Sequence, residues 1–337
     1  MGSDVSAAEL FAGIGGLGLG ARRAGLEVEV AVEVDCRRLE VYVRAVAPRK
    51  PLCADAREVD YAQLGGISVL IAGPPCQPYS MATPSRSRGV AHRLYGLDLE
   101  VARAAKEAYP EVVVVEEVPG WDPEPLAKIL SSSGYSTRYE LVDFSEYGVP
   151  IAKKRWILIA SRRGDPARAF HRLSELREPP RSAAEALLGL PPDPCPEDEC
   201  EWGGAKVYNH RSPKVKSRIR ELFPYIPPGY SLRKAHREGL VDASKYVRDL
   251  EKKHSYWLYR IPLQGPAKAV PHPRRSMMLH PIYNRVITAR ELARLMTFPD
   301  RLDLRPLNLE DMYRSLADAV PPAFSEKLFA ALVSTLL

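Results

Sequence analysis

Short apolar runs alternate with longer amphipathic stretches along the first half of the chain. Runs rich in valine and isoleucine predict β-strands at residues 5–11, 26–34, 67–73, 111–118 and 155–161. Apolar positions at helical spacing predict α-helices between them, at residues 15–25, 36–47, 97–109 and 124–134. This alternation predicts an α/β fold with a doubly wound, mostly parallel sheet and helices on both faces. Ligands of such a sheet bind beyond the carboxyl ends of the strands.

The pattern changes in the middle of the chain, where proline and charge replace clean periodicity. Residues 162–287 contain 24 Lys and Arg against 14 Asp and Glu, whereas the rest of the chain contains 24 against 28. Helical spacing returns at 289–298 and 322–337. We therefore expect an α/β domain at 1–165, a smaller, irregular and basic domain at 166–285, and a C-terminal segment at 286–337 that returns to the first domain.

The overall composition narrows the class of protein. At 45% hydrophobic and 27% charged residues, the composition is that of an ordinary globular protein and excludes wholesale disorder or a fibre. No run approaches the roughly 20 apolar residues of a membrane-spanning helix, and the N-terminus lacks a secretory signal, so we expect a cytoplasmic protein. Five cysteines are too few and too scattered for a disulfide scaffold. Three Asn and three Gln beside 31 Pro favour a thermophilic source.

A glycine-rich loop follows the first predicted strand. Gly13, Gly15 and Gly18 have the spacing G-x-G-x-x-G, which lets the backbone turn tightly and approach a cofactor at the start of a helix. Glu33, about 20 residues further on, can accept hydrogen bonds from ribose hydroxyls. The pattern fits NAD and S-adenosylmethionine equally well, and a plain structural turn is the alternative. Asp55, after the next segment, can bind an adenine amino group or cap a helix.

The loop after the strand at 67–73 carries the most informative stretch, Gly-Pro-Pro-Cys-Gln-Pro-Tyr-Ser at 73–80. Its prolines place Cys76 on a stiff segment at the ligand-binding edge of the sheet, as suits a nucleophile. An isolated cysteine is more often a small buried hydrophobe. The strand at 111–118 delivers Glu116 to the same edge, where a carboxylate can act as an acid or simply be solvated.

Six short motifs occur along the chain in a fixed order. They are Phe-x-Gly-x-Gly-Gly at 11–16, Pro-Pro-Cys-Gln at 74–77, Glu-x-Val at 116–118, Tyr-Gly-Val-Pro at 147–150 followed by Arg155, Arg-Glu-Leu-Ala-Arg-Leu-Met at 290–296, and Ala-Val-Pro at 319–321. In this series the chain resembles the cytosine-C5 DNA methyltransferases, over about 6–161 and 288–335. The resemblance implies a Rossmann-like, class I S-adenosylmethionine methyltransferase fold, in which the basic middle is the target-recognition domain.

The resemblance also implies covalent catalysis on a cytosine that has been flipped out of the DNA duplex. The Cys76 thiolate would attack C6, Glu116 would protonate or hydrogen-bond N3, and Arg155 would hold O2, with Lys153 in place of a second arginine. S-Adenosylmethionine would be the cofactor, and no metal would be needed. The residues that would line the cofactor site are Phe11, Gly13, Gly15, Gly16, Glu33, Val34, Asp55, Pro75, Leu97, Asp318 and Val320.

Beside Val34, which stands where an aromatic side chain often stacks on adenine, three residues depart from the family pattern. Glu117 stands where Asn usually follows the catalytic Glu, and it adds a second negative charge unless its side chain points away from the site. Lys153 keeps the charge of the usual arginine but loses its planar fork. Asp318 replaces the usual Asn before Ala-Val-Pro. These changes are compatible with an active, divergent enzyme.

The resemblance and the basic middle together imply double-stranded DNA as the partner, because lysine and arginine neutralise phosphates while aromatic side chains and arginine forks reach bases. Candidate DNA contacts are Gln77, Ser80, Arg274 and Arg275. We expect a monomeric enzyme of the prokaryotic restriction-modification type, with a restriction endonuclease acting on the same site. Cys195 and Cys200 lack a second ligand pair for zinc, so a solvent loop or a local disulfide is expected there.

Three other functions remain open at this point. A tRNA cytosine-C5 methyltransferase would share the motifs, although its branch of the family has a smaller middle region with a Cys-Phe-Thr signature that this chain lacks. A DNA-binding protein without catalysis would account for the three departures. An NAD oxidoreductase would account for the glycine-rich loop and Glu33, but it leaves the Pro-Pro-Cys-Gln motif unexplained.

Overall fold

The computed structural model describes all residues except 1–4, 78, 80–93 and 270–275, and it divides into two compact units. The first unit contains 1–147, 154–178 and 319–337, and the second contains 148–153 and 179–318. These boundaries differ from the predicted ones. Residues 286–318, which we expected to return to the first domain, belong to the second unit, and the chain returns only at Ala319, directly after a helix that ends at Asp318.

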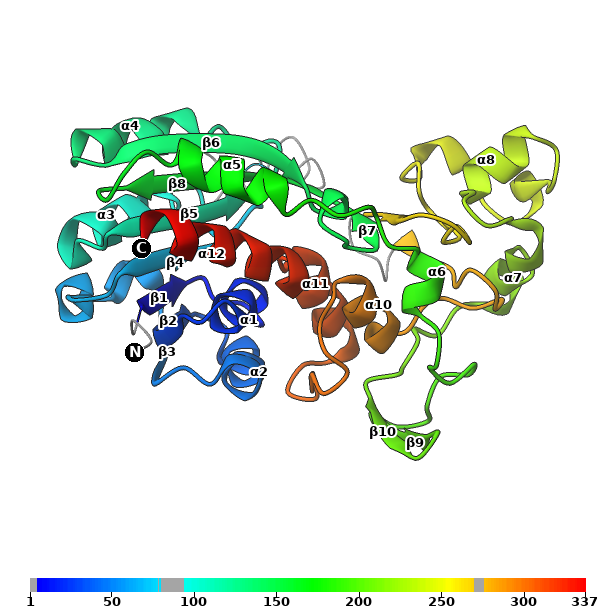
Figure 1. The fold of residues 1–337 in the computed structure, drawn as a ribbon. Helices are drawn as coiled ribbons and strands as arrows, with labels where there is room; N and C mark the ends of the chain where they lie inside the picture. Colours follow the sequence, from blue (N-terminus) through cyan, green and yellow to red (C-terminus); the bar gives the residue numbers. More distant parts are fainter. Residues whose placement is uncertain (1–4, 78, 80–93, 270–275) are drawn as a thin grey trace. The chain divides into compact units, whose positions relative to one another are not determined.

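A seven-stranded sheet forms the centre of the first unit (Figure 1). Its strands in chain order are β1 (Ser6–Leu10), β2 (Glu27–Glu33), β3 (Lys50–Cys53), β4 (Val69–Ala72), β5 (Val112–Glu117), β6 (Ser136–Asp143) and β8 (Lys154–Ser161). Their order in space is β3-β2-β1-β4-β5-β8-β6. Only β8 runs antiparallel to its neighbours, β5 and β6. The predicted doubly wound, mostly parallel sheet is confirmed.

Helices cover both faces of this sheet (Figure 1). One face carries α1 (Gly16–Arg23), α2 (Cys36–Val46), α5 (Ala167–Glu175) and α12 (Pro322–Leu336). The other face carries α3 (Leu99–Ala108) and α4 (Glu124–Ser132), which pack on alternate strand residues such as Leu70 and Val113. Strands β4 and β5 are buried throughout, because both of their faces are covered.

The elements of the first unit follow from local sequence. All five predicted strands and all four predicted helices are present, with ends that differ by a few residues. Helix α2 begins after Asp35, whose carboxylate accepts a hydrogen bond from the backbone amide of Arg37 and so caps the helix. Strands β3 and β6, which we did not predict, are the two edges of the sheet.

The second unit has little regular structure. Its elements are β7 (Ile151–Ala152), α6 (Ala183–Ala186), β9 (Glu199–Trp202), β10 (Ala205–Tyr208), α7 (Ser217–Arg220), α8 (Leu232–Arg237), β11 (Ala267–Lys268), α10 (Ala289–Leu295) and α11 (Leu309–Asp318). Buried arginines replace part of the missing backbone hydrogen bonding. Arg260 donates to the carbonyl oxygens of Phe223, Ile226, His280 and Tyr283. The predicted helix at 289–298 is confirmed as α10.

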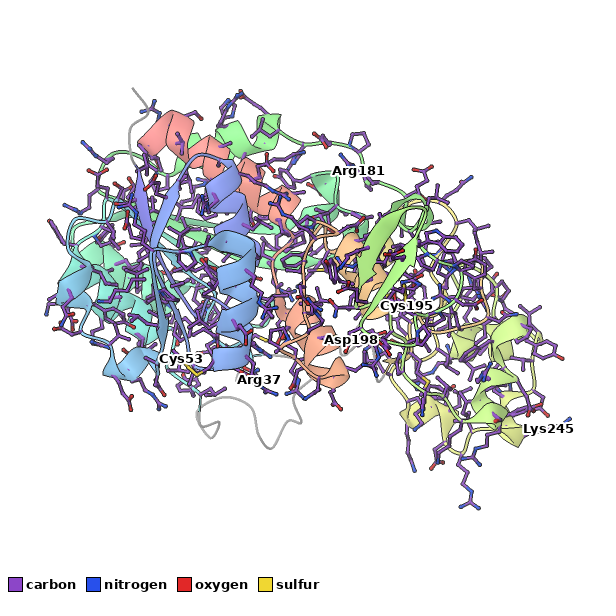
Figure 2. The ribbon with its side chains drawn as sticks, turned by 90° about the horizontal axis from the view of Figure 1, so that it is seen from below. Arg37, Cys53, Arg181, Cys195, Asp198 and Lys245 are labelled. Carbon is purple, nitrogen blue, oxygen red and sulfur yellow. A yellow bond between two sulfur atoms is a disulfide. The ribbon has the colours of Figure 1, made fainter. Side chains whose placement is uncertain are left out.

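Two disulfides lie among the described cysteines, one in each unit. Figure 2 labels Cys53 in the first unit and Cys195 in the second. Cys195–Cys200 matches one of the two alternatives predicted for that segment. Cys36–Cys53 was not predicted, and Cys76 is the described cysteine that forms no disulfide. No helix in the described part of the chain is long and apolar enough to cross a membrane.

Candidate active site

Cys76 lies on the loop at the carboxyl end of β4, as predicted. It is the fourth residue after the strand, and its side chain is partly buried. The carbonyl oxygen of Cys76 accepts a hydrogen bond from the backbone amide of Tyr79 at 3.0 Å, which closes a turn directly after the cysteine. The two prolines before Cys76 and this turn after it hold the thiol on a constrained segment.

Glu116 and Arg155 lie next to the same loop. The carboxyl end of β5 meets the start of β8, because the two strands run antiparallel. Arg155 Nε is 2.8 Å from Glu116 Oε1, and the side chains are only 16% and 9% exposed. A methyl group placed on Gly73, in the Cys76 loop, would lie 3.7 Å from Glu116 Oε2. The structure therefore brings Cys76, Glu116 and Arg155 to one edge of the sheet.

Glu117 does not add a second negative charge to this edge. Successive strand residues point to opposite faces of a sheet, so its side chain points away from that of Glu116. The side chain is 1% exposed, and its Oε2 accepts a hydrogen bond from the backbone amide of Val118 at 2.6 Å. Burial, and then the charge of Glu116, raises the pKa of Glu117 well above its ordinary value. Burial therefore favours the neutral form of the Glu117 carboxyl group.

A buried carboxylate ties the Cys76 loop to the loop after β5. Asp98, directly before α3, accepts hydrogen bonds from the Tyr79 hydroxyl at 3.1 Å and from Trp121 Nε1 at 3.0 Å. The two loops also touch through their backbones, because a Cβ on Gly120 would lie 2.4 Å from the Tyr79 carbonyl oxygen. We did not predict this contact. The only sequence signal is an Asp before a helix, which predicts a cap that Asp98 does not form.

The loop after β1 lies beside Glu33, as predicted. Gly13 and Gly15 have φ values of +55° and +90°, which favour glycine, and Phe11 also has a positive φ of +55°. Glu33 accepts hydrogen bonds from the backbone amides of Gly13 at 2.8 Å and Asp35 at 2.9 Å. This buried carboxylate therefore connects the loops that follow β1 and β2.

The same region fits an adenosyl cofactor. A Cβ on Gly13 would meet nothing closer than the Phe11 carbonyl oxygen at 4.0 Å, so the backbone there borders open space. Val34, next to Glu33, is 67% exposed despite being apolar. A glycine backbone open to a ligand, a buried acceptor for hydroxyls and an exposed apolar side chain are the groups that a nucleoside requires.

The other predicted cofactor residues of the first unit are placed as follows. A Cβ on Gly16 would lie 2.1 Å from the Val320 carbonyl oxygen, so Val320 packs directly on the start of α1. Pro75 lies partly buried in the Cys76 loop, and Leu97 lies buried before α3. Asp55 caps a 3-10 helix at Ala56–Glu58 and pairs with Arg57. Hydrogen bonds from Arg57 lower the pKa of Asp55 to about 2.

Lys153 and Asp318 belong to the second unit. Lys153 is buried, and its Nζ donates a hydrogen bond to the Ala317 carbonyl oxygen at 2.7 Å. Its catalytic role and the cofactor role of Asp318 stay predictions. Gln77 lies in the Cys76 loop with a buried Oε1 that accepts no hydrogen bond from the described residues. The remaining predicted DNA contacts, Ser80, Arg274 and Arg275, lie outside the described residues.

The sheet, the glycine-rich loop and the post-strand cysteine define a class I S-adenosylmethionine methyltransferase. The family model for C-5 cytosine-specific DNA methylases matches residues 5–334, and the chain belongs to that family. It is thus a DNA (cytosine-5-)-methyltransferase whose cofactor is S-adenosylmethionine.

Several known proteins are similar to this chain. The type II methyltransferase M.BbvI of Brevibacillus brevis is 28% identical, over 97% of this chain and 90% of that protein. M.DdeI of Desulfomicrobium norvegicum is 24% identical, over 95% and 86%. Among solved structures, a prophage-encoded protein (E. coli) assigned as a DNA modification methyltransferase aligns with a TM-score of 0.74 and 21% identity over 99% of both chains. The S. pombe Dnmt2 methyltransferase aligns with a TM-score of 0.59 and 18% identity, over 99% of this chain and 98% of that chain.

Proposed function

We propose that the protein methylates C5 of a cytosine within one specific sequence of duplex DNA, through a covalent bond between Cys76 and C6. The observation that carries this proposal is the Glu116–Arg155 ion pair at 2.8 Å beside the Cys76 loop. The pair places a carboxyl group and a cation where a cytosine attacked by Cys76 would present N3 and O2. The Glu116 carboxylate would take up a proton when the base binds and would then act as the acid. The type II methyltransferases among its relatives support a role in restriction and modification.

The cysteine is needed because cytosine C5 is a poor nucleophile. The Cys76 thiolate forms a bond to C6, the C5–C6 double-bond electrons move to C4–C5, and the C4–N3 electrons move to N3, which takes a proton from Glu116. The cofactor, when bound, would supply C5 with an electrophilic methyl group on a sulfonium, whose neutral thioether is the leaving group. Transfer of the C5 proton to water then re-forms the C5–C6 double bond and expels the Cys76 thiolate, and N3 returns its proton to the Glu116 carboxylate.

Arg155 has two roles in this scheme. Its Nε holds the Glu116 carboxyl beside the Cys76 loop, and its Nη1 donates to the Lys154 carbonyl oxygen at 2.8 Å. These contacts direct the guanidinium, and we assign Nη2 as the donor to cytosine O2. A fixed cation at O2 stabilises the negative charge that develops as the thiolate adds to C6.

The cofactor contacts follow from the loops after β1 and β2. We assign the ribose hydroxyls to Glu33, the adenine face to Val34, and the methionine end to Phe11, Gly13 and Gly15. Gly16, Pro75, Leu97 and Val320 complete the lining on the first unit. Asp55 would read the adenine amino group with the lone pairs that Arg57 leaves unused. Asp318 is a further candidate cofactor contact, and Lys153 is a candidate catalytic residue.

DNA recognition is assigned to the second unit. C5 and C6 are inaccessible inside a duplex, so the target cytosine must be flipped out of the stack. The excess of Lys and Arg over Asp and Glu between 162 and 287 suits contact with phosphates. Gln77, Ser80, Arg274 and Arg275 are the candidate contacts near the target base. A restriction endonuclease acting on the same sequence is the expected functional partner of a monomeric enzyme.

A covalent trap tests this mechanism. On duplex DNA that contains 5-fluorocytosine, the fluorine cannot leave as the proton does, so the Cys76 adduct should persist in denaturing gels. We expect an adduct with the native protein and with the Cys195→Ser/Cys200→Ser control, none with Cys76→Ser, and a rate about 10²-fold lower with Arg155→Ala. An adduct with Cys76→Ser would contradict the mechanism.

Substrate class is tested separately. Duplex DNA and total tRNA are incubated side by side with labelled cofactor and native protein. We expect transfer to DNA. Transfer to tRNA alone would favour the tRNA methyltransferase, and tight DNA binding without any transfer would favour a protein that binds but does not react.

A further inference from the structure

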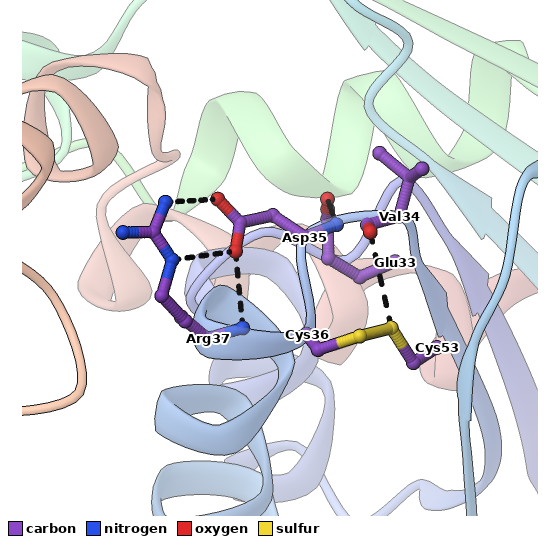
Figure 3. The surroundings of a disulfide bond; sticks show 6 residues. All are labelled: Glu33, Val34, Asp35, Cys36, Arg37 and Cys53. Carbon is purple, nitrogen blue, oxygen red and sulfur yellow. Dashed lines mark hydrogen bonds and ion pairs between the residues drawn. A yellow bond between two sulfur atoms is a disulfide. The ribbon is translucent and has the colours of Figure 1, made fainter.

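The Cys36–Cys53 disulfide joins the start of α2 to the end of β3 (Figure 3). Cys53 ends β3 and lies in register with Glu33 on β2. Cys36 begins α2, directly after Asp35. The Cys53 sulfur lies 3.8 Å from the Val34 carbonyl oxygen, a contact and not a hydrogen bond, because a disulfide sulfur carries no proton. The bridge therefore lies beside the segment that carries Glu33 and Val34.

The strand that carries Cys53 is an edge strand with one neighbour in the sheet. β3 is four residues long, lies at the edge of the sheet and pairs only with β2. Lys50, Pro51 and Cys53 are exposed, and Pro51 has no backbone N–H to donate. Short, exposed edge strands open locally at low cost. Asp55 follows this strand by two residues, so its position depends on how firmly the end of β3 is held.

The disulfide completes a chain of contacts across three post-strand loops. Glu33 joins the loops after β1 and β2 through the amides of Gly13 and Asp35. Asp35 caps α2 and accepts two hydrogen bonds from the Arg37 guanidinium (Figure 3). The Cys36–Cys53 disulfide connects these two loops to the loop after β3. The β2–β3 pairing also holds the end of β3, and hydrogen bonds from Tyr61 and Arg103 to the Ala56 carbonyl oxygen hold the loop that follows. The disulfide adds a covalent link where the strand meets this loop.

We propose that the Cys36–Cys53 disulfide is a positioning element of the cofactor site, which holds Val34 and Asp55 in place for the adenine and makes cofactor affinity depend on thiol redox state. This inference rests on the proposed assignment of Glu33, Val34 and Asp55 to the adenosine. Cys76 and Glu116 take no part in the bridge, so its loss should weaken cofactor binding and leave the chemical step unchanged.

Both sulfurs are within reach of a reductant. Cys36 and Cys53 are exposed, whereas Cys195 of the second disulfide is only 8% exposed. A dithiol reductant such as dithiothreitol gives two electrons and two protons to the bridge. The Cys36–Cys53 bond breaks to two thiols, and the reductant closes to its own cyclic disulfide. Cys76 forms no disulfide and is not changed by this step.

The test compares three proteins with and without dithiothreitol: the native chain, Cys36→Ser/Cys53→Ser and the matched control Cys195→Ser/Cys200→Ser. Calorimetry gives the Kd for S-adenosylmethionine, steady-state assays on duplex DNA give kcat and KM, and circular dichroism confirms folding. We expect Cys36→Ser/Cys53→Ser to raise Kd and the cofactor KM at least fivefold, with kcat and the DNA KM within twofold of native. Dithiothreitol should produce the same shift in the native protein and the control, and none in Cys36→Ser/Cys53→Ser.

Two further variants separate this inference from the proposed function. Glu33→Gln and Val34→Ala should each raise the Kd for S-adenosylmethionine if the adenosine lies where we assign it. An unchanged Kd in both would contradict the assigned cofactor site. If both Glu33→Gln and Val34→Ala bind the cofactor more weakly while folded Cys36→Ser/Cys53→Ser keeps the native Kd, the proposed role of the disulfide is overturned. The assigned cofactor site is then still supported. A fall in kcat with no change in cofactor KM would also overturn it.

Discussion

Glu9 provides a test of the electrostatics beneath the cofactor loop. It lies on β1 and is 2% exposed, and its Oε2 accepts a hydrogen bond from the Tyr42 hydroxyl at 2.6 Å. A Cβ on Gly18 would lie 2.4 Å from the same oxygen, so the glycine leaves room for the carboxyl group. Burial, aided by the charge of Glu33, raises the pKa of Glu9 to about 8, so the group is mostly protonated at neutral pH.

The raised pKa makes stability fall as the pH rises. Below pH 4.5, the ordinary value, Glu9 is protonated in both the folded and unfolded states and has no effect. Between pH 4.5 and about 8 the unfolded chain loses the proton while the folded protein keeps it, so the free energy of unfolding decreases. At about 1.4 kcal/mol per pH unit, the total loss is about 5 kcal/mol. Glu9→Gln, which cannot ionise, removes this loss.

The assay is equilibrium unfolding in guanidinium chloride, followed by circular dichroism at pH 5, 6, 7 and 8. The stability of Glu9→Gln relative to the native protein should increase by about 1.4 kcal/mol per pH unit. Glu117, also buried with a raised pKa, is present in both proteins, so its contribution cancels. Glu27→Gln, on the exposed start of β2, is the control. Its free energy of unfolding should change with pH as that of the native protein does. A constant difference between Glu9→Gln and native protein across this range would refute the reasoning.

Three further outcomes follow from the structure. Gly16→Ala should lower the free energy of unfolding by about 1–3 kcal/mol, because its Cβ would lie 2.1 Å from the Val320 carbonyl oxygen. Gly65→Ala, with its nearest neighbour at 3.4 Å, should stay within about 0.5 kcal/mol in the same denaturation assay. Tyr79→Phe removes the hydroxyl that donates a hydrogen bond to Asp98, and it should lower kcat without changing the Kd of the cofactor. An unchanged kcat would show that this hydrogen bond does not position Cys76. Calorimetry should give a Tm above about 60 °C, as a thermophilic composition predicts.

The part of the fold that could be predicted is the buried part. β4 and β5 are continuous Val, Leu and Ile runs, because helices cover both of their faces. The edge strands β3 and β6 were not predicted. One contains Pro51, and the other has only one buried residue, Val142, with Arg138 and Glu140 in its middle. An edge strand has one neighbour and so carries a weak apolar pattern. The structure of the second unit could not be predicted for a related reason, because hydrogen bonds from buried side chains such as Arg260 hold this unit together.

The candidate site also contains a part that could be predicted from the sequence and a part that could not. Cys76 and Glu116 follow directly from strand ends, because parallel strands bring their carboxyl ends to one edge. The disulfide and the Asp98 contacts could not be predicted, because each joins residues that are far apart in the chain. Cys36 and Cys53 are 17 residues apart and meet only because β3 pairs in register with β2.

Bisulfite sequencing of DNA from cells that express the chain tests the central claim most directly, because it reports the modified atom, the recognised sequence and the activity together. Cells that carry the native gene should show protected cytosines within one short sequence, and cells that carry Cys76→Ser should show none. Glu27→Gln, a surface change on β2, should leave the pattern of protection intact. Protection that persists with Cys76→Ser, or DNA without protected cytosines in cells that contain folded native protein, would contradict the account.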